Sequence, residues 1–131
     1  MQHKMELHGW YLEKSEQALI TAKDNIKLDH LDAAQNRIYY AIFYIVTVLA
    51  YKNNFITSKH KQLLGWFNKI IIHERAIFDN NIFNIYKEAY LKRQKSDYEE
   101  LFYTTKEEVQ ELLDKATFFV ETIKEYILKE K

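Results

Sequence analysis

The chain has 131 residues, with 19 basic and 19 acidic side chains, two glycines, and neither cysteine nor proline. Without cysteine there is no disulfide framework, thiolate metal site or cysteine nucleophile. The scarcity of glycine and proline argues against a fold built from many hairpins. A formal net charge of zero provides no overall field to attract nucleic acid or an anionic membrane, so any such binding must use a local patch.

The apolar segments are too short to cross a membrane. The N-terminal residues are polar and charged, unlike a secretory signal. The longest apolar run, residues 38–51, is interrupted only by Thr47 and suits a buried helix better than a bilayer span. We therefore predict a cytoplasmic protein that makes no membrane contact.

The N-terminal half predicts two long helices. The first covers about residues 6–25 and places Trp10 and Tyr11 on its apolar stripe. The second covers about residues 31–52, follows Asp29 as a candidate N-cap, and is apolar nearly all round from Ile38 onward. This pattern makes the second helix the expected centre of the fold.

The C-terminal half predicts three more helices, of which the first is short. It starts at Thr57 or Ser58 and runs to about residue 72, with Gly65 allowing close packing. The next runs from possible caps at residues 79–81 to about Arg93, and a polar connection follows over residues 94–104. Residues 105–108 form a capping box for the last helix, whose apolar residues keep helical spacing for five turns. The expected fold is all-α, an up-and-down four-helix bundle with an additional short helix, forming a single domain over residues 1–131.

Two arginines break the apolar pattern in which they lie. Arg37 shares a helical stripe with Tyr40 and Tyr44, and Arg93 shares one with Tyr86 and Tyr90. A buried guanidinium needs a carboxylate, a carbonyl or an anionic ligand, because leaving it unpaired costs several kcal/mol. Arg93 can pair with Asp97 four residues later and cover Tyr90 with its stem, or it can bind a ligand.

A basic segment, Ser58-Lys59-His60-Lys61, stands at the expected start of the short helix. Free backbone N–H groups there, together with Lys59 and His60, are able to bind phosphate. The alternative is a solvated basic turn that Ser58 simply caps.

Other chemistries find little support. The five histidines lack the helical pairing that zinc sites use, and there is no glycine-rich phosphate loop, so no metal and no cofactor are predicted. The ten tyrosines can stack on nucleic-acid bases, but at helical spacing they more often belong to the core.

Four segments, in order along almost the whole chain, resemble the HEPN domain family. They are Ala34-Gln35-Asn36-Arg37-Ile38-Tyr39-Tyr40-Ala41-Ile42-Phe43-Tyr44, Ser58-Lys59-His60, Trp66-Phe67 and Arg93-Gln94-Lys95-Ser96-Asp97-Tyr98. The chain looks most similar to small stand-alone members that are often encoded beside a minimal nucleotidyltransferase. The resemblance implies a helical bundle that forms a homodimer.

Many proteins of that family are metal-independent ribonucleases that act as toxins or in antiviral defence. The resemblance implies that an Arg stabilises the phosphate, while a His a few residues later transfers protons. In some pairs the nucleotidyltransferase antitoxin modifies a tyrosine beside this motif. Arg93 and Tyr98 match that pattern, whereas Asp97 stands where the motif has His, and no histidine follows it.

Three hypotheses follow. The first is a protein that binds RNA, a nucleotide or a nucleotidyltransferase partner through Arg37, Arg93, Lys59 and His60, without efficient turnover. The second is an active toxin ribonuclease that uses Arg93 with Asp97 or His60. The third is a structural dimerisation module in which Arg37, Asp97 and Tyr98 form a buried polar network.

Overall fold

The computed structural model describes residues 2–98 and 103–129, with side chains from residue 7 onward. Its described part contains no strand and consists mainly of helices: α1 (Gln2–Lys27), α2 (Leu31–Lys52), α3 (His60–Trp66), η1 (Phe67–Glu74), α4 (Asn80–Tyr98) and α5 (Lys106–Lys129). The segment η1 continues α3 as a π-helix. The all-α prediction is therefore confirmed.

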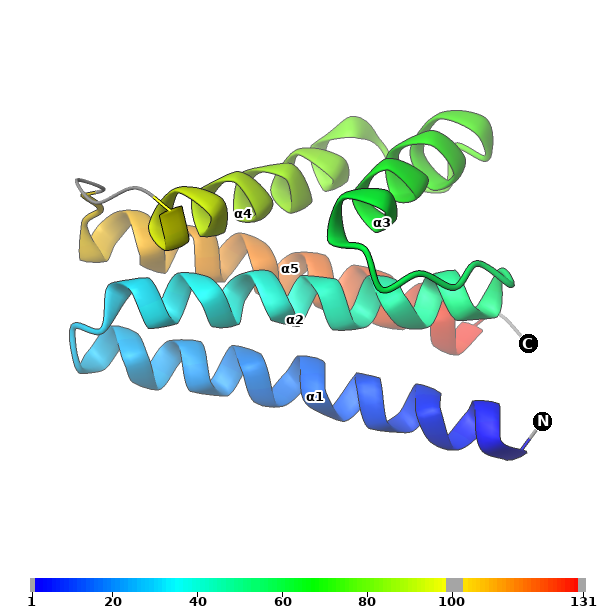
Figure 1. Ribbon diagram of the computed structural model, residues 1–131, viewed down its shortest axis with the longest axis horizontal. Coiled ribbons are helices and arrows are strands. Elements are labelled where there is room, and N and C mark those ends of the chain that lie inside the picture. Colours follow the sequence, from blue (N-terminus) through cyan, green and yellow to red (C-terminus); the bar gives the residue numbers. More distant parts are fainter. Residues whose placement is uncertain (1, 99–102, 130–131) are drawn as a thin grey trace.

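The four long helices run up and down. In Figure 1, α1 and α2 lie side by side in opposite directions, and α4 and α5 complete the bundle. The short α3 packs on α2 from the same side as α4, so α3 and α4 together cover that side of α2. Because α2 contacts every other α-helix, it is the central element that the sequence predicts.

The core follows the apolar patterns of α2 and α5. Along α2, Ile38, Ile42 and Ile45 are completely buried. Burying each such side chain contributes about 1.5–3 kcal/mol. On α5, the buried residues repeat at the predicted spacing: Val109, Leu112, Leu113, Ala116, Phe119, Val120, Ile123 and Ile127.

Two details at the α1–α2 side differ from the prediction. Asp29 does not cap α2; it has a positive φ of 59°, and the N-cap is His30, which makes no side-chain capping bond. Asp29 instead pairs with Lys106 at 3.5 Å. Trp10 does not face the core either, because 49% of its surface is exposed.

The other helix boundaries place the candidate residues. α4 continues past Arg93 to Tyr98, so Asp97 lies in the helix and not in a connection. α3 begins at His60, two or three residues later than predicted, with Lys59 as its N-cap. The capping residue of α5 is confirmed, since the Glu108 backbone N–H donates to Thr105 Oγ1 at 3.1 Å.

Gly65 has no packing role in the described structure. It is exposed, and an added Cβ would meet no heavy atom within 4 Å, so the predicted close packing is wrong. Alanine forms helix more readily than glycine by about 0.5–1 kcal/mol. We expect Gly65→Ala to raise the free energy of unfolding by about that amount in urea titrations. A destabilised variant would show that a hidden contact requires the glycine.

A cluster of cations and aromatic rings at the crossing of three helices

Arg93 and His60 meet at the same pair of tyrosine rings. The Arg93 guanidinium carbon lies 5.3 Å from the ring centre of Tyr39 and 5.4 Å from that of Tyr40. The Tyr39 hydroxyl lies 2.8 Å from His60 Nδ1. We call Tyr39, Tyr40, His60 and Arg93 the Tyr39 cluster.

The helices explain why these side chains converge. Tyr39 and Tyr40 lie in the middle of α2, His60 is the first residue of α3, and Arg93 lies in the last two turns of α4. Since α3 and α4 both pack on α2, their side chains reach the same stretch of it. Phe43, one turn after Tyr39, stacks on the His60 ring with centroids 4.2 Å apart.

Arg93 is held by aromatic rings and one carboxylate. Its Nε lies 3.0 Å from Asp97 Oδ2, which is the i,i+4 ion pair that the spacing predicts. The Arg93 side chain is 20% exposed. Its Nε is buried and, among the described residues, lacks a partner with good hydrogen-bond angles, so the Asp97 contact is an ion pair without an aligned hydrogen bond. The guanidinium lies against Tyr39 and Tyr40.

His60 is biased toward its neutral form. Partial burial lowers the pKa of His60, and the nearby positive charge of Arg93 lowers it further. Burial raises the pKa of Tyr39 well above the ordinary tyrosine value, so its hydroxyl keeps its proton. A neutral imidazole and a neutral phenol therefore face each other beside a guanidinium at neutral pH.

Arg37 adds a second cation to Tyr40. Its guanidinium carbon lies 5.0 Å from the Tyr40 ring centre, and Nε and Nη2 both donate to Asn36 Oδ1, at 3.2 and 2.9 Å. Arg37 is half-buried, so it lies at the edge of the core and not inside it. The two arginines and Asp97 carry a combined formal charge of +1, so this group of side chains is positive although the whole chain is neutral.

Two predicted residues lie apart from this cluster. Lys59 is exposed and has no described contact with Arg93 or Tyr39. His60 turns inward to Tyr39, so the two residues of the predicted basic turn do not face the same site. Tyr98 is 77% exposed. The predicted buried network of Arg37, Asp97 and Tyr98 is wrong, because Asp97 pairs with Arg93 and Tyr98 points out of the core.

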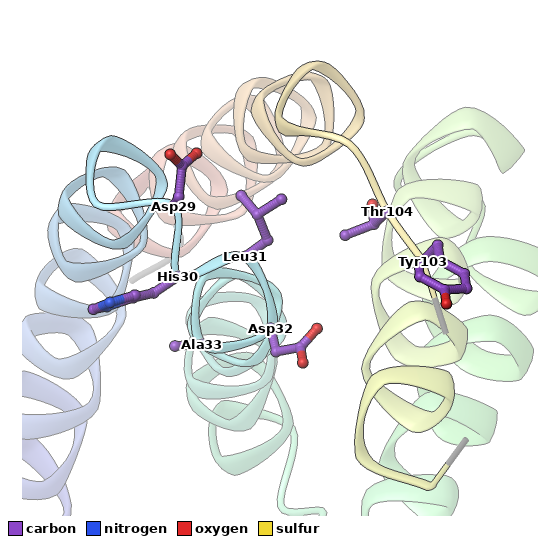
Figure 2. A pocket seen from close by; sticks show the side chains of 7 residues that line it. All are labelled: Asp29, His30, Leu31, Asp32, Ala33, Tyr103 and Thr104. Atoms are coloured by element: carbon purple, nitrogen blue, oxygen red, sulfur yellow. The ribbon is translucent and has the colours of Figure 1, made fainter. Parts of the chain in front are cut away.

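A shallow pocket at the end of the bundle has different chemistry. Figure 2 shows it between the start of α2 and the residues that precede α5, with the Asp32 carboxylate on the side of Tyr103 and Thr104. Asp29 and Asp32 make its lining acidic. An acidic lining is unfavourable for a phosphate group.

Residues 2–98 and 103–129 contain neither a cluster of metal ligands nor a membrane-spanning helix. Among the described side chains, no group of three or more acidic residues or histidines is placed to hold a metal ion. No helix among these residues is both long and apolar enough to span a membrane.

The sequence did not predict the contact between Tyr39 and His60. The two residues are 21 positions apart and lie on different helices, so no helical spacing relates them. The available signals were the Tyr-Tyr pair in the family-like segment of α2 and a histidine at a helix start. Neither signal specifies a hydrogen bond.

Comparison with known proteins agrees with the helical architecture. The sequence model of the HEPN domain matches residues 8–126. The chain therefore belongs to the HEPN domain family.

Two curated relatives match over nearly the whole chain. The protein named "Putative toxin MJ0142" from Methanocaldococcus jannaschii is 32% identical over 128 residues, which cover 98% of this chain and 86% of that protein. The "UPF0332 protein" of Thermotoga maritima is 29% identical over 127 residues, which cover 97% and 96% of the two chains.

The environment of His60 makes folding stability depend on pH. A histidine whose pKa is lower in the folded state supports folding above its unfolded pKa of about 6.5, and this contribution is lost as pH falls toward the folded pKa. We expect His60→Gln to flatten the fall in unfolding free energy between about pH 7 and pH 5. Parallel pH profiles for the two proteins, measured by urea unfolding, would contradict the assignment.

Proposed function

We propose that this HEPN protein is of the toxin type and binds the phosphate groups of RNA or a nucleotide at the Tyr39 cluster. The observation that carries the proposal is the convergence of Arg93 and His60, from α4 and α3, on the same Tyr39 ring. The toxin type is supported by the name of the Methanocaldococcus relative. A half-buried guanidinium beside a hydrogen-bond donor is a recurring way to recognise phosphate.

Binding without efficient turnover suits the protonation states in the cluster. Cleavage of RNA through its 2′-hydroxyl needs one group to accept a proton and another to donate one. Asp97 is the ion-pair partner of Arg93, and a carboxylate in an ion pair accepts hydrogen bonds but has no proton to donate. The lowered pKa of His60 also limits its supply of protons at neutral pH.

An active metal-independent ribonuclease is the second candidate, and one observation favours it. His60 contacts the same Tyr39 as Arg93 does, so a histidine lies near this arginine although none follows it along the chain. In this alternative Arg93 stabilises the phosphate and His60 or Asp97 moves the proton.

We also propose that the protein forms a homodimer. Trp10 is half-exposed and packs edge-on against Tyr11 with centroids 4.9 Å apart, which leaves an aromatic surface that a second copy would cover. A mass equal to one 15.9 kDa chain in solution would contradict this proposal.

A nucleotidyltransferase antitoxin is the further partner that we propose, with Tyr98 as its target. Tyr98 is exposed at the end of α4, so it is accessible to a modifying enzyme, and a nucleotide added there would bring negative charge to the same end of the helix as Arg93. Intact-mass analysis after incubation with a nucleotidyltransferase encoded beside this gene tests the idea. Tyr98→Phe should abolish the added mass, and Tyr103→Phe, which changes an equally accessible tyrosine at 85% exposure, should not.

Arg93 gives the direct test of the binding site. We expect Arg93→Ala to weaken binding of a labelled short RNA by roughly tenfold or more, because a charge-assisted hydrogen bond contributes about 1.5–3 kcal/mol. Fluorescence anisotropy at fixed salt measures the affinity, and circular dichroism verifies folding. Arg75→Ala is the matched control, since it removes the same charge from an exposed arginine beside Asn53. Equal affinity of the Arg93 variant and the original protein would remove Arg93 from the site.

Asp97 separates binding from catalysis. If the cluster only binds phosphate, Asp97 competes with the ligand for Arg93, and Asp97→Asn should strengthen RNA binding by severalfold. If Asp97 acts as a base, the same variant should lose any RNA cleavage. Binding and cleavage measured on one preparation distinguish these results, and weaker binding would contradict the competition.

A further inference from the structure

The Tyr39 hydroxyl has one hydrogen-bond partner in the described structure, and that partner is His60 Nδ1 at 2.8 Å. Tyr39 has no exposed surface, so water does not offer its hydroxyl an alternative. A buried hydroxyl without an acceptor costs about 1–3 kcal/mol. The bond is therefore important for both residues.

The direction of this bond follows from protonation. The phenol keeps its proton because burial disfavours the phenolate, so it must donate to an acceptor. Neutral imidazole has one acceptor nitrogen, and the phenol reaches Nδ1. The ring proton of His60 then resides on Nε2.

Aromatic neighbours fix the plane of the imidazole. Phe43 stacks on it with an angle of 16° between the rings, and Tyr40 meets it edge-on at 81°. His60 is half-exposed, and its Nε2 makes no hydrogen bond to a described residue. The oriented ring thus leaves Nε2–H as the donor for an external group.

The positive charge beside this donor indicates which kind of external group would accept its hydrogen bond. Arg93 lies over the same Tyr39 ring and brings a permanent positive charge. Its ion pair with Asp97 joins Nε to Oδ2, and among the described residues the two terminal nitrogens of the guanidinium make no hydrogen bond, so they are available to a ligand. A neutral N–H and a guanidinium together suit the oxygens of a phosphate group.

We propose that Tyr39 is a positioning residue that holds His60 with its proton on Nε2, so that His60 and Arg93 clamp one phosphate group. His60 in this role is a neutral donor and not a general base. The inference rests on the proposed function, because it assigns roles within the same phosphate site.

The tautomer is measurable without any ligand. In phosphate-free buffer above pH 7, ¹⁵N NMR should show His60 Nε2 protonated and Nδ1 unprotonated. Tyr39→Phe should convert this to a mixture of tautomers, whereas Tyr44→Phe, which removes a phenol hydroxyl from the same helix, should leave the His60 spectrum unchanged. Protonated Nδ1 in the original protein, or no change in Tyr39→Phe, would overturn the inference.

Binding of inorganic phosphate and of the labelled RNA tests the clamp. His60→Ala should weaken both by roughly tenfold, while His60→Gln should keep most of the affinity, since a glutamine amide donates from a position similar to Nε2. A glutamine variant as weak as the alanine variant overturns the neutral-donor role. Failure of the proposed function is distinguishable, because RNA affinity would then be insensitive to Arg93→Ala, whatever the tautomer of His60.

Discussion

The burial of Tyr39 in the middle of α2 is the constraint on which the site depends. Its ring is inaccessible, so its hydroxyl must find a protein partner, and His60 on α3 supplies one at 2.8 Å. The same ring provides a face for the Arg93 guanidinium from α4. Tyr39 therefore connects α2 with α3 and α4. Its burial in the core determines where His60 and Arg93, the residues proposed to bind phosphate, are placed.

The cluster also places local positive charge on a chain without net charge, as the proposed anion site requires. Arg37 and Arg93 both lie against Tyr40, and Asp97 neutralises only one of them. The rings cover part of each guanidinium, which limits its hydration and strengthens its attraction for a phosphate. Acidic residues elsewhere, such as those of the pocket at the bundle end, balance the total without cancelling this local charge.

Much of the fold followed from the sequence because helical periodicity is a local property. The order of the helices, the centrality of α2 and the Thr105 cap were all predicted. Trp10 was misplaced because a stripe gives no information about how wide the packed face is. The site was predicted only in part: the Arg93–Asp97 pair has local spacing, whereas the contact of His60 with Tyr39 depends on how α3 docks on α2.

Arg93 and His60 are proposed to form one phosphate site, and a double-mutant cycle shows whether the two side chains share a ligand. The affinities of the original protein, Arg93→Ala, His60→Ala and the double variant for the same labelled RNA give the coupling between the two side chains. If Arg93 and His60 hold one phosphate, the loss of binding free energy in the double variant should be smaller than the sum of the losses in the two single variants, by about 0.5 kcal/mol or more. Losses that multiply independently would show that the two residues do not share a ligand.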